Sequence, residues 1–532
     1  LASSNAAVWL LFCLGALSVS EGGKLLVVPM DGSHWLSMSS VVERLAQNGH
    51  EIIVAKPENS IVKFDSNFSG SSLIEVVLTA RNSLILGALS VTEGGKLLVV
   101  PMDGSHWLSM SSVVESIMGV QHMINSMCES LLHNKQFIRN LQEEKFDAVL
   151  NDPMFFCGVI LAEHLGIPSV HFLRGIPCMY DYISAQCDSP LSYVPRHFTQ
   201  NSDKMNFLQR VGNTLLSLAE PILCGAAFRG WEHLASEFLQ REVTAIQLLS
   251  RTSVWLMRVD FVFDHPRPVM PNMVYIGGIN CAGTKPLSQE FEKLVNSSGE
   301  HGFVVFSLGS MVSEIPMNKA MDIAEALKSI PQKVFWRYTG KAPPNLGENT
   351  HLVKWLPQND LLAHPKARAF ITHAGSHGIY EGICNAVPMV MMPLFGDQMD
   401  NAKRIESRGA GLTLNVLHMT PEDLSNAVRA VINNPVYKEN IQRMSSLHLD
   451  RPIHPLDLAV HWVEFVMRHK GAPHLRPAAH DLNWFQYYSL DVIGFLLAVL
   501  LTALFISLKC CTFVFRRCFK RNSKKQRKSK SQ

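Results

Sequence analysis

Short apolar runs alternate with longer stretches of helical periodicity through the first half of the chain. The apolar runs predict strands at Lys24–Pro29, His50–Ala55, Phe146–Leu150, Ser169–Leu173 and Val254–Met257. Stretches with apolar residues every three or four positions separate them and predict helices. Strand–helix–strand units of this length form parallel sheets with helices on both faces. The pattern therefore predicts a doubly wound α/β domain.

The second half of the chain repeats this alternation. Strands are expected at Met273–Gly278, Phe303–Ser307, Val334–Tyr338, Ala367–Thr372 and Val387–Pro393. A proline-rich segment, Asp264–Asn272, precedes them and is typical of a linker between domains. We therefore expect two Rossmann-like α/β domains, residues 22–270 and 271–450, which face each other across a cleft.

The stretch from Trp355 to Gln398 contains candidate ligand-binding residues at a strand-to-helix turn. Ser376 is expected to cap a helix whose first N–H groups are electropositive, and Gly375 would let a phosphate approach the backbone. His373 ends the preceding strand, where it can donate to a phosphate oxygen. These residue types at one turn suit a nucleotide diphosphate.

The other polar residues of this stretch suit the rest of a nucleotide sugar. Glu381 can accept hydrogen bonds from ribose hydroxyls, and Trp355 offers a flat face for a base, with Gln358 beside it. Asp397 and Gln398 follow the next strand and suit sugar hydroxyls. The order Trp-x-x-Gln, His-Ala-Gly, Glu and Asp-Gln resembles the donor-binding signature of UDP-glycosyltransferases.

Glycosyl transfer to a hydroxyl needs a base, and the first domain offers two candidate histidines. His34 and His106 each follow a predicted strand, and Asp152 ends another strand and can orient an imidazole. The two histidines lie in two copies of one segment, because Gly15–Glu43 recurs as Gly87–Glu115 with a single change. Two near-identical copies indicate a duplication or misassembly rather than a structural repeat. We favour His34, which keeps the strand that follows it, with His106 as the alternative.

The two ends of the chain carry membrane signals. The net charge of the 532 residues is only +3, yet nine Lys and Arg residues crowd into the last seventeen positions. Nothing in this distribution indicates nucleic-acid binding. Residues 1–21 are similar to a secretory signal peptide, and 490–508 are apolar enough for a membrane-spanning helix. The basic tail, 509–532, is expected in the cytosol by the positive-inside rule.

The same reading places the body of the protein in the lumen of the endoplasmic reticulum as a single-pass membrane protein. Lys528–Gln532 has the Lys-x-Lys-x-x form of a retrieval signal for that compartment, and 451–489 is expected to hold helices and a membrane-proximal segment. Asn67 and Asn296 lie in glycosylation sequons. The seven cysteines of the body form no C-x-x-C pair, so we predict neither a zinc site nor a disulfide framework.

Nearly the whole chain resembles the vertebrate UDP-glucuronosyltransferases that conjugate phenols and bilirubin. Lys24–Met38, Phe146–Pro153 and Trp255–Cys281 carry this resemblance together with the signature stretch. It implies a GT-B fold, in which the histidine of Asp-Gly-Ser-His-Trp is the base and the aspartate of the Asp-Pro turn is its partner. These roles fall on His34 or His106 and on Asp152.

The resemblance also implies a donor site and a reaction. The implied donor-binding residues are Arg258, Ser310, Trp355, Gln358, His373, Gly375, Ser376, His377, Glu381, Asp397 and Gln398. The implied reaction transfers glucuronic acid from UDP-glucuronate to a hydroxyl or carboxyl of a small lipophilic acceptor, with inversion at the anomeric carbon. UDP-glucuronate is then a co-substrate, and no motif calls for a metal or a bound cofactor.

Two other functions stay open from the sequence alone. One is a transferase of the same fold that uses UDP-glucose or UDP-galactose. The other is a catalytically inactive membrane glycoprotein that pairs with active relatives, because the repeated segment disrupts the first domain. Homo- or hetero-oligomers with related transferases are compatible with both interpretations.

Overall fold

The computed structural model describes residues 22–30, 33–57, 73–78, 125–281, 283–310, 312 and 314–529. Three predictions lie outside these residues: the signal peptide at 1–21, the second copy of the repeated segment with His106, and the sequon at Asn67. The chain forms two compact units that divide after Leu475. Each unit is described separately below.

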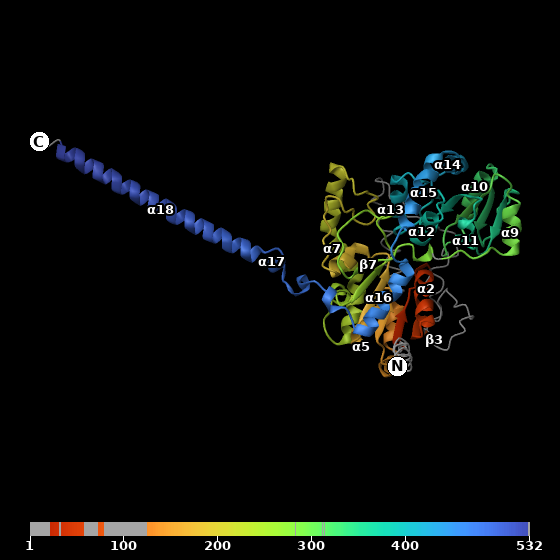
Figure 1. Cartoon of the computed structure of the whole chain (residues 1–532), viewed down its shortest axis with the longest axis horizontal. Coiled ribbons are helices and arrows are strands. Elements are labelled where there is room, and N and C mark those ends of the chain that lie inside the picture. Colours follow the sequence, from red (N-terminus) through yellow and green to blue (C-terminus); the bar gives the residue numbers. More distant parts are fainter. Residues whose placement is uncertain are drawn as a thin grey trace, which may run out of the picture. The chain divides into compact units, whose positions relative to one another are not determined.

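The first unit contains two parallel β-sheets (Figure 1). The first sheet has the order β3-β2-β1-β4-β5-β6-β7, and every neighbouring pair is parallel. Its strands are β1 (Lys24–Val28), β2 (Glu51–Pro57), β3 (Leu73–Leu78), β4 (Ala148–Asn151), β5 (Ser169–Leu173), β6 (Val254–Met257) and β7 (Met273–Tyr275). This topology confirms the predicted doubly wound α/β domain.

Helices cover both faces of the first sheet. Alternate residues of β1 reach opposite cores, with Leu26 and Val28 on one face and Leu25 and Val27 on the other. The first face packs against α4 (Lys135–Glu143), α5 (Cys157–Leu165), α6 (Tyr180–Ser184), α7 (Phe207–Leu239) and α8 (Ala245–Leu249). The second face packs against α2 (Ser33–Gln47) and α16 (Pro455–His469).

Two expected domain boundaries are wrong. Met273–Tyr275, which we expected to open the second domain, pairs with β6 as the last strand of the first sheet. Helix α16, expected to belong to a separate C-terminal segment, buries Leu456 and Val463 in the core of that same sheet. The chain therefore crosses between the two halves twice, after Gly278 and again before Pro455. Local apolar patterns do not reveal which of two parallel sheets a strand or helix joins.

The second sheet has six strands in the order β10-β9-β8-β11-β12-β13, again with parallel neighbours. They are β8 (Phe303–Ser307), β9 (Lys333–Arg337), β10 (Thr350–Val353), β11 (Ala367–Thr372), β12 (Met389–Met391) and β13 (Gly411–Thr413). One face packs on α10 (Met317–Lys328) and α14 (Pro421–Asn433). The other packs on α9 (Gln289–Asn296), α11 (Gln358–Ala363), α12 (Ser376–Cys384), α13 (Gln398–Ser407) and α15 (Pro435–Leu449).

Two aspartates after β6 tie the two halves of the first unit together. Asp260 accepts hydrogen bonds from His448 and Arg451, at and just beyond the end of α15. Asp264 accepts two hydrogen bonds of 2.8 Å from the guanidinium of Arg174, and Arg404 of α13 lies 3.4 Å from the same carboxylate. Because all these groups are largely buried, the junction depends on charges that compensate one another away from water.

The body contains three disulfides, so the expectation that it would have no disulfide framework is wrong. They join Cys128 to Cys157, Cys178 to Cys224, and Cys281 to Cys384. Cys187 is buried and free. Each pair joins segments that are separated by 29 to 103 positions in the chain. Such pairs come together only through the tertiary fold, and the spacing of the cysteines carries no sign of them.

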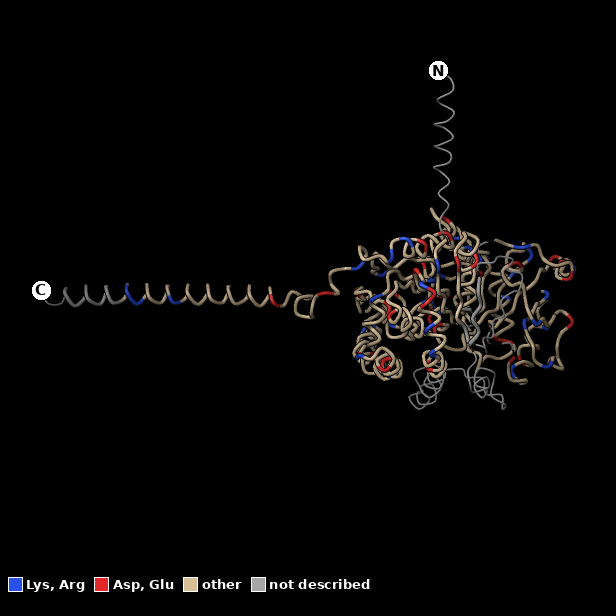
Figure 2. The backbone as a smooth tube through the Cα atoms, turned by 90° about the horizontal axis from the view of Figure 1, so that it is seen from below, with Lys and Arg blue, Asp and Glu red and all other residues tan. Residues whose placement is uncertain are grey.

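The second unit begins at Arg476 and consists mainly of helices. It contains η5 (Ala478–Asp481), α17 (Trp484–Tyr487) and α18 (Leu490–Ser529), while η4 (Pro473–Leu475) ends the first unit. Within α18, Leu490–Arg517 is long and apolar enough to cross a membrane, and an 18-residue window of it has a mean hydropathy of 2.4. Figure 2 shows an uncharged length of this helix before its first basic positions. The described helix continues well into the segment that we expected to be a separate tail.

We predict that Asp260→Asn destabilises the first unit by about 3 kcal/mol, because it leaves His448 and Arg451 without their carboxylate partner. Burial raises the pKa of Asp260, but the His448 hydrogen bond and the Arg451 charge outweigh it and lower the pKa. A depressed folded-state pKa gives stability that is present at neutral pH and is lost as the pH falls through that value. Urea unfolding of the full chain in detergent at several pH values measures this.

The control is Asp457→Asn, which removes an exposed ion pair with Arg44. It should change the free energy of unfolding by less than about 1 kcal/mol. Equal effects of the two substitutions, or an Asp260→Asn effect that does not shrink in acid, would contradict the assigned role.

Candidate active site

A cavity of about 750 Å³ lies between the two halves of the first unit and receives side chains from both. It is lined by His34 and by all eleven residues expected to bind the donor: Arg258, Ser310, Trp355, Gln358, His373, Gly375, Ser376, His377, Glu381, Asp397 and Gln398. The carboxyl ends of both sheets supply these residues, which is where doubly wound sheets bind ligands. Of the predicted catalytic and donor-binding residues that the structure describes, all but Asp152 therefore line one cavity.

His34 and Asp152 form a hydrogen-bonded pair at the first sheet. His34 Nδ1 lies 2.6 Å from Asp152 Oδ2. The two residues meet because β1 and β4 are neighbours, with Val28 opposite Asn151, so the segments after both strands leave the sheet side by side. Asp152 is fully buried, whereas the side chain of His34 is 28% exposed. The pair therefore presents an imidazole to the cavity and keeps its carboxylate behind it.

The surroundings of Asp152 fix its orientation. Its Oδ1 atom accepts a 3.0 Å hydrogen bond from the Met154 amide. His171 lies nearby on β5, where its Nδ1 atom bonds Asn151 at 2.9 Å. Burial lowers the pKa of His171 to about 3, although the charge of Asp152 raises it. His171 is therefore neutral at pH 7 and adds no charge of its own beside Asp152.

The second sheet places a tight turn beside a glycine loop. Thr372 at the end of β11 lies opposite Ser307 at the end of β8, so His373 and Gly309 become neighbours. A Cβ atom on Gly309 would come within 2.6 Å of the His373 ring. Ala374 turns the chain into α12 with a φ of 63°, a strained conformation that non-glycine residues adopt mainly at functional sites. The turn directs the first N–H groups of α12 toward the cavity.

His373 is a neutral donor in this turn. Burial lowers its pKa to about 4, with Asp397 acting in the opposite direction. The Nδ1 atom of His373 has no hydrogen-bond partner within the described residues. A neutral imidazole next to free helical N–H groups can bind an anion through hydrogen bonds without adding a full charge.

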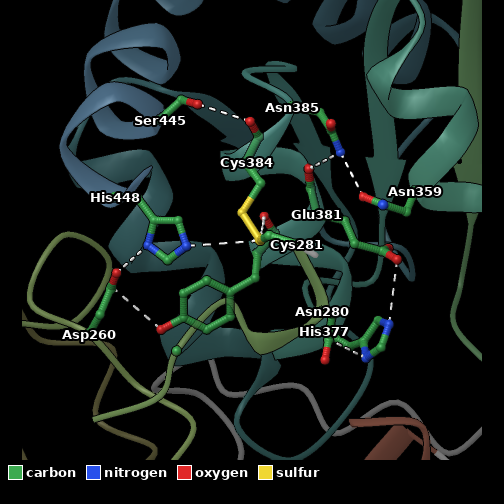
Figure 3. Close-up of a disulfide and its surroundings, with 12 residues drawn as sticks. Asp260, Asn280, Cys281, Asn359, His377, Glu381, Cys384, Asn385, Ser445 and His448 are labelled. Atoms are coloured by element: carbon green, nitrogen blue, oxygen red, sulfur yellow. Dashed lines mark hydrogen bonds and ion pairs between the residues drawn. A yellow bond between two sulfur atoms is a disulfide. The ribbon is translucent and has the colours of Figure 1, made fainter. Parts of the chain in front are cut away.

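Helix α12 carries two further polar residues of the site, which Figure 3 shows. Glu381 is 5% exposed and accepts a hydrogen bond from the Gln358 side chain. His377 lies 3.4 Å from Glu381 and accepts a 2.5 Å hydrogen bond from the Asn280 amide. Ser37 of α2, in the first half, reaches the same His377 ring nitrogen at 3.3 Å. Both halves therefore hold α12 in place.

A disulfide adds a covalent clamp one turn further along α12. Cys281 ends η3 (Ile279–Cys281), which follows the first sheet, and it is bonded to Cys384 at the end of α12 (Figure 3). Asn280 and Cys281 thus attach two consecutive positions of η3 to α12 on either side of Glu381. His448 Nε2 lies 3.9 Å from the Cys281 sulfur. With both sulfurs in the disulfide, these three residues offer no thiolate ligands for a metal.

Asp397 and Gln398 lie at the start of α13. Asn401 donates a 2.9 Å hydrogen bond to Asp397, whose side chain is half exposed to the cavity. The side-chain oxygen of Gln398 accepts from the backbone amides of Leu394 and Phe395. These two hydrogen bonds hold the loop after β12 against the Gln398 side chain. The carboxylate of Asp397 is therefore more available than the Gln398 side-chain oxygen to accept a hydrogen bond from a ligand.

Two arginines of the site were missed by the sequence analysis. Arg337 ends β9, donates to the carbonyl oxygens of Gly309 and Ser310, and lies 5.3 Å from the centre of the half-exposed Trp355 ring. Arg174 follows β5, lines the cavity and lies 3.8 Å from Asp397. Each is a charged residue at the carboxyl end of a buried strand. That position could have identified both as candidate site residues from the sequence.

Comparison with known proteins gives one family. The sequence model described as UDP-glucoronosyl and UDP-glucosyl transferase matches residues 23–82 and 113–525. The chain belongs to this family. It is 59% identical over 525 residues to UDP-glucuronosyltransferase 1A1 of Mus musculus and 56% identical over 527 residues to that of Homo sapiens, in each case with 98% of this chain and 97% of the relative covered.

Solved structures of glycosyltransferases share the fold. VinC in complex with DTDP has a TM-score of 0.57 at 17% identity, and Os79 of O. sativa in complex with UDP has a TM-score of 0.53 at 16% identity. Each alignment covers 84% of this chain and all of the other chain. The transferase thus has the GT-B fold expected from the sequence, and its family transfers sugars from nucleotide-linked donors.

We predict that replacing both Cys281 and Cys384 with serine raises the KM for the nucleotide-sugar donor roughly three- to tenfold. Losing the clamp loosens α12, and misplacement by 1 Å can cost up to about a hundredfold. Steady-state kinetics with varied donor and fixed acceptor measure the change. The control removes Cys178 and Cys224, whose disulfide lies wholly within the first half. An equal rise of the donor KM in both double variants would contradict the clamp.

Proposed function

We propose that this transferase moves glucuronic acid from UDP-glucuronate to a hydroxyl or carboxyl group of a small lipophilic acceptor, with inversion at the anomeric carbon. The observation that carries the proposal is the His34–Asp152 pair, which faces the eleven expected donor-binding residues across one cavity. The names of the relatives that match over nearly the whole chain support the choice of glucuronic acid.

In this proposal His34 is the base. Its Nδ1 atom is engaged by the buried carboxylate of Asp152, so Nε2 is the nitrogen left to take the acceptor proton. Asp152 holds the tautomer and stabilises the imidazolium that forms. As the acceptor oxygen attacks the anomeric carbon, the bond to UDP breaks and the configuration inverts. His34 stays protonated until the product leaves.

The second sheet would stabilise the departing UDP. The helix start at Gly375 and Ser376, the glycine turn before Ser310, and the neutral imidazole of His373 all offer donors to a diphosphate. Trp355 would stack on the base, and Glu381 would accept from the ribose. Because these donors are fixed by the fold, they need no reorganisation during the reaction. We propose that the transfer proceeds without a metal ion.

Arg258 is the best candidate for the carboxylate of the donor sugar. It is 4% exposed, lines the cavity and donates a 3.1 Å hydrogen bond to Ser37. Its Nε atom has no partner among the described residues. A buried guanidinium with a donor left over suits a carboxylate better than a hydroxymethyl group. Arg258 thus distinguishes glucuronate from glucose in this proposal.

The family match also supports His34 rather than His106. Its matched ranges include the first copy of the repeated segment from residue 23 onward and leave out 83–112, which contains His106. His34 lies in the strand-and-helix unit that reaches Asp152. We propose that the second copy is not part of the catalytic machinery.

The membrane location is the remaining part of the proposal. Helix α18 supplies an apolar stretch for a single span, which supports an anchored protein. The retrieval signal at Lys528–Gln532 and the exposed sequon at Asn296 suit a lumenal body in the endoplasmic reticulum with its basic tail in the cytosol. We propose that Asn296 is glycosylated, and that oligomers with related transferases form in the same membrane.

We predict that Arg258→Met lowers kcat/KM with UDP-glucuronate about ten- to a hundredfold, while leaving the use of UDP-glucose unchanged or increased. The reason is that one charge-assisted contact is lost only with the carboxylate sugar. Labelled donors and a fixed phenol acceptor in microsomes measure this. The matched variant Asp397→Ala should weaken both donors, since hydroxyl groups are common to both sugars. Transfer of glucose but not glucuronate by the parent chain would overturn the donor assignment.

We predict that His34→Ala lowers kcat about a hundred- to ten-thousandfold through loss of the base, with UDP affinity unchanged. Asp152→Asn should lower kcat through the wrong tautomer. His106→Ala is the control and should retain full activity. Rapid-quench kinetics with equilibrium UDP binding separate chemistry from donor binding. Activity that depends on His106 instead would assign the role of base to His106. A parent chain that binds UDP but transfers no sugar would favour the inactive glycoprotein.

A further inference from the structure

The acceptor end of the cavity contains one buried acid that the proposed reaction does not use. Its walls are largely apolar, with Met127, Phe155 and Val194 among them. Asp181 lies in the same wall, on the short helix α6 that follows β5. It is fully buried. A carboxylate in such surroundings needs a compensating partner.

Arg267 supplies a compensating charge nearby, but no side chain in the described structure donates a hydrogen bond to Asp181. Neither carboxylate oxygen of Asp181 is paired with a side-chain donor among the described residues. Burial raises the pKa of Asp181 to about 6, although Arg267 and nearby backbone amides act to lower it. The carboxylate is therefore mostly charged at neutral pH. It lies at the cavity wall as an acceptor to which no described side chain donates a hydrogen bond.

The tyrosines and one end of Arg267 near Asp181 make contacts with other groups. Arg267 stacks on the Tyr182 ring at 3.3 Å and donates to Ser189. The hydroxyl groups of Tyr182 and Tyr275 lie 3.0 Å apart. His197, on the same wall, is kept neutral because burial lowers its pKa to about 4. Asp181 is thus the acid of this cluster, and no described side chain donates a hydrogen bond to either of its carboxylate oxygens.

The fold also fixes Asp181 in its place. Cys178 and Met179, directly before α6, both adopt left-handed backbone conformations, with φ values of 69° and 59°. Non-glycine residues stay there only when the surrounding structure holds them. The disulfide from Cys178 to Cys224 of α7 supplies that constraint. A Cβ atom on Gly175 would lie 3.6 Å from the Asp181 carboxylate, which places this acid against a cavity-lining backbone.

We propose that Asp181 recognises the acceptor by accepting a hydrogen bond from a hydroxyl or ammonium group at the end remote from the reacting oxygen. The inference rests on the proposed function and specifies its substrate class. The reacting oxygen belongs at His34, after β1, whereas Asp181 follows β5. The two strands are separated by β4 alone, so their ends lie roughly 10 Å apart. We expect the preferred acceptors to be phenols about two rings long with a distal donor.

Four biphenyl phenols test this inference with the full chain in microsomes. 4-Hydroxybiphenyl has no distal donor, and its 4′-methoxy derivative has only a distal acceptor. The 4′-hydroxy and 4′-aminomethyl derivatives place a neutral and a cationic donor at the far end. We expect the wild type to prefer the last two in kcat/KM, and Asp181→Asn to reduce that preference about ten- to a hundredfold. The unsubstituted phenol should react equally well with both proteins.

Asp188→Asn is the matched control, since it removes the same charge from an exposed position seven residues further along. It should leave all four phenols unaffected. Thermal unfolding shows whether Asp181→Asn is folded, and Asp181→Glu should restore part of the preference. A loss that is equal for all four acceptors assigns Asp181 a structural role and overturns the proposal. A wild type without any preference for a distal donor overturns it as well.

Direct binding separates this inference from the proposed function. Equilibrium dialysis of the 4′-aminomethyl and unsubstituted phenols, in the presence of UDP, needs no transfer. If the wild type binds the amine more tightly and Asp181→Asn does not, the inference holds even where no sugar is transferred. If transfer occurs but binding shows no such difference, Asp181 recognition fails while the proposed function stands.

Discussion

The active site depends on a junction of buried charges between the two halves of the first unit. Asp260 and Asp264 follow β6, and each binds basic side chains from beyond the first sheet: His448 and Arg451 in one case, Arg404 in the other. Such pairs add little net stability over apolar residues, but they are costly to break and tolerate few alternative arrangements. They therefore suit a place where relative position matters more than strength. The cavity that joins both sheets lies beside this junction.

The local sequence was sufficient to predict an element's bounds where its apolar pattern lies between residues that favour turns. Strands β5 and β6 begin and end at the predicted residues, since each is a short buried run bounded by proline or polar positions. The site was predictable for a related reason. In parallel sheets, residues that follow neighbouring strands meet at one edge, so His34 and Asp152 converge although 118 positions separate them. The donor residues gather through the same rule.

The errors concern contacts between segments that are distant in the chain. The local patterns of β7 and α16 do not indicate which sheet they join. Only the assembled first sheet shows that β7 pairs with β6 and that α16 packs on its face. The three disulfides likewise join residues from different elements. Arg174 and Arg337 were missed for a different reason. Their positions after β5 and at the end of β9 point to the site, but their roles depend on Asp264, Trp355 and the carbonyl groups of the glycine turn.

The two ends of the cavity offer different polar groups to a ligand. The difference follows from the helices, strands and turns that form each end. On the second sheet, the turn into α12 and the glycine loop after β8 leave backbone donors open, which suits an anion that every substrate shares. On the first sheet, apolar residues surround a few fixed acceptors, His34 and Asp181. Backbone donors cannot be changed by substitution, whereas side-chain acceptors can. The proposed donor site and the proposed acceptor site therefore differ in how far substitution can change them.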